Sequence, residues 1–487
     1  MLYEINTRCW LRELSQSAGK AITLDTVPEA EFARWRRLGF SYVWLMGVWT
    51  SGPKSREQAL SPPMRAAYAE VLPDWQETDV AASPYAIADY HVPAALGGET
   101  GLRAFRGQLH EYGLKLVLDF VPNHVGLDHP WVRERPELLV QSATAEAGTF
   151  AQQTNGRKIW LAHGKDPYSG AWTDTVQLDY RVQATHLAMT SLLESVAARC
   201  DGVRCDMAML VLSDVIARTW QRFPAIGPPA NSEFWSEAIR AVKRTNPRFL
   251  FLAEAYWGVE PRLQELGFDY TYDKDLYDRL AGRRWSEVGG HLLSHPPEFV
   301  AHSAHFLENH DEPRIAHFLS TAEHRAAALV LLGLPGLRFL HEGQLSGARL
   351  RSPVQLIRRP REPEQPEVRR IYEEFLALLP ATAVGQGRFR LCRPRAAWEG
   401  NPTADNFVIV YWESQPPEFD LVAVNLAPHP SQCYVALPAL PGAVSQWSMK
   451  NRIGPGDYLR STDELQKRGL YLDVPPHGAQ LFQFRPA

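Results

Sequence analysis

Four short segments of the sequence each couple an apolar run to a carboxylate, and three of the four carry an Asn, His or Arg beside it. The segments are Asp119–His124, Gly202–Asp206, Phe251–Glu254 and Phe306–Asp311. Each stands where a β-strand could end, and the catalytic groups of a (β/α)8 barrel gather at the C-terminal ends of its strands. Carboxylates that meet at one such rim are the groups that break a glycosidic bond. The segments therefore predict carbohydrate chemistry on a barrel.

The alternation of side chains along a strand gives two of the acids different surroundings. Arg204 and Asp206 are two residues apart, so they would point the same way, and the guanidinium favours the ionised carboxylate that a nucleophile requires. Glu254 follows three apolar residues. We expect that setting to raise its pKa, as a general acid near neutral pH requires. Neighbouring strands lie about 4.8 Å apart, so the two carboxyls can approach the ~5–5.5 Å of a retaining pair.

The fourth segment supplies a third acid, Asp311, to which a sugar hydroxyl could hydrogen-bond. His124 and His310 are donors suited to the same hydroxyls. Glu308 differs from Asp311 in strand parity and is predicted to be structural. The later segment His341–Gln344 could line the same cleft or form a structural turn.

Strand-like and helical runs alternate along most of the chain, which is typical of an α/β fold. The candidate barrel strands are Leu2–Trp10, Tyr42–Gly47, Leu114–Phe120, Gly202–Asp206, Phe249–Glu254, Phe268–Tyr272, His305–Asp311 and Gly336–His341. Helical patterns between them include Pro28–Leu38, Thr100–Tyr112, Thr185–Arg199, Ser232–Arg244, Glu323–Leu332 and Pro366–Leu378.

Two stretches break this alternation and predict further domains. The stretch from His124 to Tyr180 is too long for a structureless loop, so we expect a small subdomain inserted after the third strand. Beyond Pro380, short β runs separated by Gly/Pro turns replace the helices, which predicts a C-terminal all-β sandwich domain. These β runs are Arg388–Cys392, Phe407–Glu413, Leu421–Ala427, Cys433–Leu437 and Gly478–Arg485. The predicted domains are the barrel (1–123 and 181–383), the inserted subdomain (124–180) and the β domain (384–487).

Together the four segments resemble the four signature regions of the α-amylase superfamily, glycoside hydrolase family 13. The resemblance implies that Asp206 is the nucleophile, Glu254 the acid/base and Asp311 the transition-state stabiliser. The implied mechanism is double displacement through a covalent β-glycosyl-enzyme, with net retention of the α configuration.

The resemblance also assigns substrate-binding roles. Arg204, His124 and His310 would hold the sugar in the cleavage subsite, and Asp119 would brace the site from below. The segment Ser83–Tyr90 resembles the region after the second strand, in which Tyr85 would stack on that sugar.

Two features depart from the family pattern. Many amylases continue from the nucleophile as Asp-x-x-Lys-His, whereas Asp206–Leu210 reads Asp-Met-Ala-Met-Leu and lacks those acceptor-side contacts. Where the family often has Pro-Asp-Leu-Asn, Gln177 takes the place of an Asp that helps to bind calcium, although Asn123 is retained. We expect no cofactor, no other metal and no tight calcium site, since an amide is a weaker ligand than a carboxylate.

The resemblance implies a hydrolase that acts on α-glucans or malto-oligosaccharides, but two other readings stay open. A transglycosylase, or an isomerase of the sucrose or trehalose type, would carry the same three acids. A catalytically dead binding relative would be expected to have lost them. Six tryptophans in or near predicted rim loops could stack on sugars, although each is more often a packing residue. They are Trp49, Trp75, Trp131, Trp160, Trp172 and Trp257.

The bulk properties exclude several classes of partner. The 487 residues are 45% apolar with a net charge of −4, and no Lys/Arg-rich run favours nucleic acid or an anionic membrane. No secretory signal or apolar stretch of membrane-spanning length is seen. Five scattered cysteines indicate reduced thiols. We expect a cytoplasmic protein with an oligosaccharide substrate and no nucleic-acid or membrane partner, and the sequence leaves the oligomeric state open.

Overall fold

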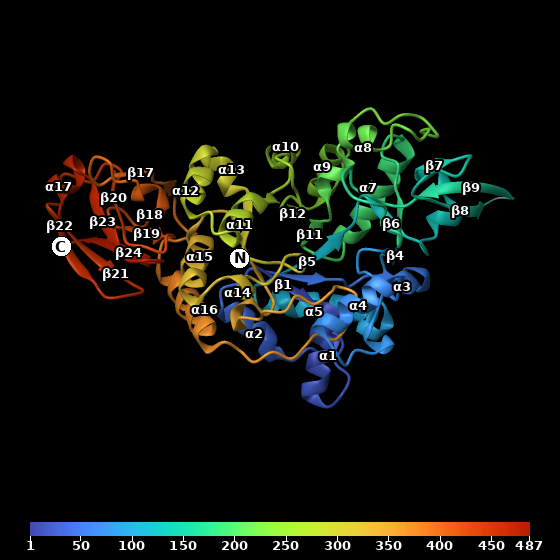
Figure 1. Ribbon diagram of the computed structural model, residues 1–487, viewed down its shortest axis with the longest axis horizontal. Coiled ribbons are helices and arrows are strands. Elements are labelled where there is room, and N and C mark those ends of the chain that lie inside the picture. The colour runs from blue at the N-terminus through green and yellow to red at the C-terminus, as the bar shows by residue number, and fades with distance from the viewer. Residues whose placement is uncertain (155) are drawn as a thin grey trace. The chain divides into compact units, whose positions relative to one another are not determined.

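Eight strands close into a barrel in the computed structural model, which describes all residues except Asn155 (Figure 1). The strands are β1 (Leu2–Asn6), β2 (Tyr42–Met46), β5 (Lys115–Phe120), β11 (Gly202–Cys205), β12 (Leu250–Ala253), β13 (Tyr270–Tyr272), β14 (Ser303–Phe306) and β15 (Leu337–His341). Their order around the barrel follows the chain, with β15 beside β1. The predicted parallel barrel is confirmed.

Two of the predicted strands end earlier in the structure because a side chain turns the backbone. The first strand stops at Asn6, whose side chain accepts a hydrogen bond from the Cys9 amide (3.2 Å) and so starts helix α1 (Thr7–Ala18). The seventh stops at Phe306. In the loop that follows, the Asn309 side chain accepts from the amides of Asp311 and Glu312, both at 2.9 Å. Asp311 therefore lies on a turn beyond the strand.

The longer helices were predictable because several turns repeat the same apolar face. The six predicted helices are α2 (Glu29–Arg37), α5 (Gly98–Glu111), α7 (Gln183–Ala197), α9 (Phe234–Thr245), α15 (Thr321–Gly333) and α16 (Pro366–Leu378). Besides α1, the structure also contains α3 (Pro53–Ala59), α4 (Pro62–Val71), α6 (Trp131–Glu134), α8 (Ser213–Thr219), α10 (Glu260–Glu265), α11 (Lys274–Ala281), α12 (Trp285–Ser294), α13 (Pro297–Ala301), α14 (Ile315–Phe318) and α17 (Thr462–Lys467). No helix within the described residues is both long and apolar enough to cross a bilayer.

The chain forms two compact units, which are described separately. The N-terminal unit comprises Tyr3–Tyr272 and Arg351–Arg361, and the C-terminal unit comprises Met1–Leu2, Asp273–Leu350 and Glu362–Ala487. The finer domain boundaries expected from the sequence stay predictions. All five cysteines are buried thiols.

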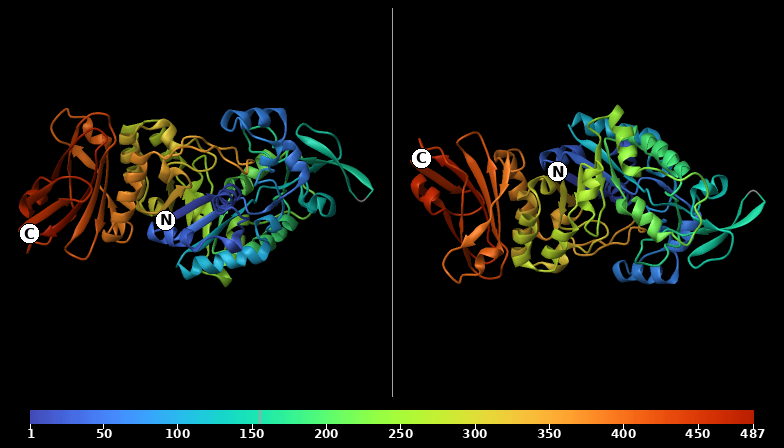
Figure 2. Two further views of the ribbon diagram at one scale, coloured as in Figure 1. Left: turned by 90° about the horizontal axis from the view of Figure 1, so that it is seen from below. Right: turned by 90° about the horizontal axis from the view of Figure 1, so that it is seen from above.

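Within the N-terminal unit, small sheets fill the stretch between β5 and α7. Strand β6 (His124–Gly126) pairs with β10 (Thr175–Gln177), which places Gln177 opposite His124. Strands β7 (Gln141–Ser142), β8 (Thr149–Thr154) and β9 (Arg157–Ala162) form a second sheet, whose β8–β9 hairpin projects as an arm in Figure 2. A further two-stranded sheet joins β3 (Thr50–Ser51) to β4 (Ile87–Asp89).

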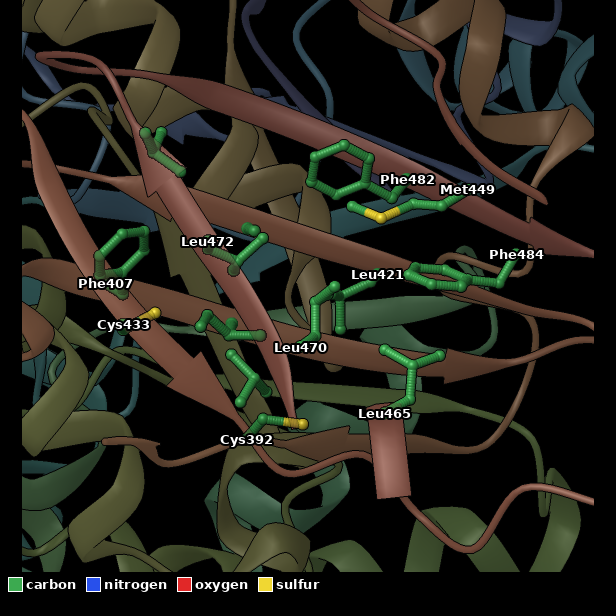
Figure 3. Packing of buried hydrophobic residues seen from close by; sticks show 14 of the residues in the cluster. Cys392, Phe407, Leu421, Cys433, Met449, Leu465, Leu470, Leu472, Phe482 and Phe484 are labelled. Atoms are coloured by element: carbon green, nitrogen blue, oxygen red, sulfur yellow. The ribbon is translucent and has the colours of Figure 1, made fainter. Parts of the chain in front are cut away.

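Two sheets end the C-terminal unit and confirm the predicted β domain. The larger contains β16 (Phe389–Leu391), β18 (Phe407–Glu413), β19 (Phe419–Asn425), β24 (Ala479–Pro486), β21 (Gln446–Asn451) and β22 (Asp457–Ser461). The smaller contains β17 (Pro394–Ala396), β20 (Ser431–Val435) and β23 (Leu470–Val474). Buried side chains of the two sheets, such as Leu421 and Leu472, pack into one core (Figure 3).

Candidate active site

The first two acids stand at the ends of neighbouring strands of the N-terminal unit. Strands β11 and β12 pair in parallel with Cys205 opposite Ala253, so Asp206 and Glu254 directly follow at the same level. The backbone ladder continues through both residues. The Asp206 amide donates to the Phe120 carbonyl (2.9 Å), and the Glu254 amide donates to the Cys205 carbonyl (3.0 Å). Both residues are buried.

A single fully buried guanidinium joins these acids. Arg204 places Nη1 2.8 Å from Asp206 Oδ1 and Nη2 2.7 Å from Glu254 Oε2. Its Nε donates to the Tyr272 hydroxyl at 3.3 Å, and Nη1 lies 4.0 Å from Asp119 Oδ1. The predicted pairing of Arg204 with Asp206 is confirmed, and Arg204 reaches Glu254 as well.

Aromatic rings surround the same cation. The Arg204 guanidinium carbon lies 5.3 Å from the ring centre of Trp44, 5.2 Å from that of Tyr85 and 5.8 Å from that of Tyr272. Burial by itself lowers the pKa of Arg204, but the Glu254 carboxylate and the other neighbouring groups raise it well above its ordinary value. Arg204 therefore stays charged, and the ring faces help to stabilise that charge.

The surroundings of Glu254 are more polar than the sequence indicated. The Met207 amide donates to Glu254 Oε2 (2.7 Å), and the Tyr256 hydroxyl donates to Oε1 (2.7 Å). Each oxygen of the Glu254 carboxylate therefore accepts a hydrogen bond, and Oε2 also pairs with Arg204. The sequence had suggested an apolar setting. The difference arises because Tyr256 is two residues on and points the same way, and because Met207 adopts a left-handed conformation (φ 43°). The Glu254–Tyr256 spacing was a usable sequence signal.

Asp119 is held from several sides as a brace. Its Oδ1 accepts from the Trp44 indole (3.2 Å), its Oδ2 from the Gly47 amide (3.0 Å) and its carbonyl from the Trp49 indole (2.8 Å). These bonds fix the end of β2 to the end of β5. Trp49 is thus buried packing and does not present its face on the rim.

His124 and Tyr85 belong to the same unit as Arg204. Burial lowers the pKa of His124 to about 4, partly opposed by the Asp174 carboxylate and by a hydrogen bond to the Tyr85 backbone. His124 is therefore neutral near pH 7. Its ring also lies edge-on to Trp172, with 5.3 Å between ring centres.

The remaining predicted pair lies in the C-terminal unit, on the loop after β14. His310 Nε2 is 3.0 Å from Asp311 Oδ2, with the His310 side chain buried and that of Asp311 47% exposed. Arg314, which no sequence pattern indicated, donates from Nη1 to Glu308 Oε1 (2.7 Å) and to the Glu342 carbonyl (2.6 Å). Glu308 Oε2 in turn accepts from the amide of Ile315. Glu308 is structural, as expected, since it anchors the turn that carries Asp311.

The segment after β15 is a buried structural turn. Arg314 Nη1 lies 2.8 Å from His341 Nδ1, and the Gln344 side chain accepts from the His341 amide (3.1 Å) and donates to the Tyr372 hydroxyl (2.7 Å). Of the two readings that the sequence left open for His341–Gln344, the bonding supports the structural one.

Comparison with known proteins places this architecture in a family. The family model for the α-amylase catalytic domain matches residues 35–355. The chain belongs to the α-amylase superfamily, glycoside hydrolase family 13. It is 25% identical to Alpha-amylase MalA of Haloarcula japonica over 281 residues, which are 56% of this chain and 38% of that protein. It is 24% identical to Trehalose-6-phosphate hydrolase of Escherichia coli over 290 residues, 49% of this chain and 51% of that protein.

The chain thus spans about half or less of those two curated relatives, but it matches solved structures along their whole length. A noncanonic maltogenic α-amylase, AmyB of Thermotoga neapolitana, superposes with a TM-score of 0.70 at 20% identity, covering 99% of this chain and 98% of that one. The α-amylase of Geobacillus thermoleovorans in complex with acarbose gives 0.66 at 18% identity, with the same coverage. At these identities the likeness shows the fold.

The residues at the α-amylase family's calcium position do not fit a cation here. The Gln177 amide nitrogen donates to three oxygens, the carbonyl and Oδ1 of Asn123 (both 2.9 Å) and the Leu178 carbonyl (3.0 Å). These are the kinds of oxygen that Ca²⁺ takes as ligands, and Gln177 already bonds to all three. Among the described residues no group of three or more His, Cys, Asp or Glu side chains could hold a metal. We propose that the Gln177 amide stands in for the cation.

Removing calcium should therefore leave stability nearly unchanged. A ligand stabilises a protein only if it binds the native state. Because the proposal leaves no calcium bound at this position, EDTA should shift the Tm little and added calcium should not raise the Tm. A large fall in Tm with EDTA, reversed by calcium, would contradict the proposal.

Removing the Gln177 amide, in contrast, should lower the stability of the protein. Gln177→Leu removes the amide donor from Asn123 Oδ1 and the Leu178 carbonyl and leaves the Asn123 carbonyl with the Leu178 amide (3.1 Å). It should therefore destabilise the fold by about 1–3 kcal/mol for the unsatisfied groups. Denaturant unfolding of both proteins, each with and without EDTA, separates the two contributions.

Proposed function

We propose that the protein is a retaining α-glycoside hydrolase that acts on α-glucans or malto-oligosaccharides through a covalent glycosyl-enzyme. The observation that carries the proposal is the pair Asp206 and Glu254, held at the same level of adjacent strands by the buried Arg204. Membership of the α-amylase family supports a glycoside hydrolase or transglycosylase.

In the first step Asp206 attacks the anomeric carbon while Glu254 gives a proton to the departing glycosidic oxygen. Arg204 favours the ionised Asp206 that this attack needs. The C1–O bond to the leaving sugar breaks as the ester to Asp206 forms.

In the second step water replaces the leaving sugar. Glu254, now a carboxylate, takes a proton from that water as its oxygen attacks C1, and the ester bond to Asp206 breaks. The two inversions restore the α configuration. Tyr256 and Met207, which hydrogen-bond to Glu254, would keep it oriented in both steps.

The other predicted residues would bind the sugar. His124 is neutral and buried, so it suits hydroxyl recognition better than proton transfer at pH 7. Tyr85 would stack on the ring, and Asp311 with His310 would bind hydroxyls as the positive charge develops. Asp311 follows β14, a strand of the same barrel.

A transglycosylase or a sucrose- or trehalose-type isomerase is the second candidate. The residues that follow the nucleophile, Ala208, Met209 and Leu210, are buried and apolar, so they offer no polar contact to an acceptor. Chromatography of the products from maltoheptaose, sucrose and trehalose distinguishes the candidates. Products that are all shorter than the substrate would support hydrolysis. Longer or isomerised products would support the transglycosylase or the isomerase.

Asp206→Asn should abolish turnover without unfolding the protein. The amide has the same shape but cannot form the glycosyl ester, so kcat should fall on the order of 10³-fold or more. Asp214→Asn removes a carboxylate from an exposed ion pair with Arg262 and serves as the matched control with full activity. The nucleophile assignment fails if Asp206→Asn keeps near-normal activity and mass spectrometry excludes deamidation.

Glu254→Gln should discriminate between leaving groups. Fluoride departs without a proton, so the variant should retain far more of its glycosylation rate on α-glucosyl fluoride than on maltoheptaose. Pre-steady-state release of fluoride isolates that first step. Equal losses on the two substrates would exclude Glu254 as the acid.

A further inference from the structure

Two large aromatic side chains of the N-terminal unit are exposed and touch each other. Tyr168 is 75% exposed and Trp257 is 41% exposed. Their ring centres are 5.1 Å apart, with an angle of 84° between the planes. The residues are far apart in sequence, one in the stretch between β5 and α7 and the other in the loop after β12. Exposed apolar surface of this kind, when it is contiguous, often marks a binding site.

The backbone at Trp257 is also strained. Its φ is 71°, in the left-handed region that large side chains rarely adopt. Gly258, with φ 74°, shares this conformation at no steric cost. Because 41% of Trp257 is exposed, packing offsets such strain only in part. Strain that packing does not explain is a reason to look for a function at the residue.

The position of Trp257 relates it to the proposed acid. Tyr256, its neighbour, donates a hydrogen bond to Glu254 Oε1 at 2.7 Å. A general acid stands beside the departing oxygen, so the sugar attached to that oxygen must lie against the chain near Glu254. Trp257 follows only three residues after it.

Tyr168 is fixed by its own turn. The amides of Tyr168 and Ser169 both donate to Asp166 Oδ1, at 2.6 and 2.7 Å. This turn orders the backbone under the exposed phenol. The two rings therefore form an ordered apolar corner at the surface.

We propose that Trp257 and Tyr168 bind the leaving-group sugar, an α-linked glucosyl unit, and later the acceptor sugar where one replaces water. The apolar C–H face of a pyranose fits a flat aromatic ring. Such contact would take the place of the polar residues that the buried segment after Asp206 lacks. This inference rests on the proposed function and adds a specificity-determining pair to it.

The test compares a substrate that has a leaving-group sugar with one that lacks it. Trp257→Gly should lower kcat/KM for maltoheptaose on the order of tenfold, the effect of losing one partly buried aromatic contact. It should leave kcat/KM for α-glucosyl fluoride unchanged, because fluoride does not reach the aromatic pair. Aryl glucosides are unsuitable here, since their own ring could stack on Trp257.

Matched variants separate binding from folding. Glycine accepts a φ of 71° without strain, so Trp257→Gly should have an unchanged or higher Tm. Tyr168→Ala should also lower kcat/KM for maltoheptaose. Trp257→Phe keeps an aromatic ring, so its kcat/KM for maltoheptaose should lie between those of Trp257→Gly and the wild type. Trp398→Ala is the control, because it removes an indole that is 56% exposed in the C-terminal unit. It should leave kcat/KM unchanged for both substrates.

The outcomes distinguish the two proposals. Suppose that the wild type cleaves both substrates while Trp257→Gly lowers kcat/KM equally for both, or for neither. In that case the aromatic pair has no such role and the proposed function stands. If the wild type cleaves neither these nor other α-glucosides, both proposals fall.

Discussion

The N-terminal unit is organised around one buried cation. Arg204 has no exposed surface, and an isolated charge in such a place costs several kcal/mol in lost hydration. Ion pairs with Asp206 and Glu254 and three aromatic faces offset that cost. Removing one partner of a buried ion pair typically costs about 3–5 kcal/mol, since the other charge is left uncompensated. The residues that would carry the chemistry are therefore also the ones that make the cation tolerable.

The same side chain ties neighbouring strands together. Through Asp206, Glu254 and Tyr272 it connects the ends of β11, β12 and β13, and Asp119 continues the network to β5 and, through Trp44, to β2. The spacing of the two candidate catalytic carboxylates is thus set by a rigid fork. A lysine would not reproduce this arrangement, because its ammonium is a point charge without the planar pair of donors.

The sequence predicted the barrel, the C-terminal β domain and the pairing of Arg204 with Asp206, because each follows from a local period of two or of about 3.6 residues. It missed what depends on tertiary contacts. The contact of Arg204 with Glu254 joins β11 to the neighbouring strand β12, which lies far away in the sequence. Nothing in the spacing of Gln177 and Asn123 indicates that the amide would donate to three carbonyl-type oxygens.

Strand ends were the least predictable places, and they are where the site lies. Asn6 and Asn309 each end an apolar run by a side-chain hydrogen bond to the backbone, which competes with the strand pattern. The conformation and exposure of Trp257 were not predictable from the sequence either. Its residue type suggested packing or stacking, but only the structure shows an exposed ring on a left-handed backbone.

The most direct test of the account is to trap the intermediate. A slow substrate such as 5-fluoro-α-glucosyl fluoride should leave a fluoroglucosyl group on the enzyme, and mass spectrometry of the digest should locate it on the peptide that contains Asp206. Asp206→Asn should show no such adduct. An active enzyme that gives no adduct, or one that carries it on a different residue, would contradict the mechanism.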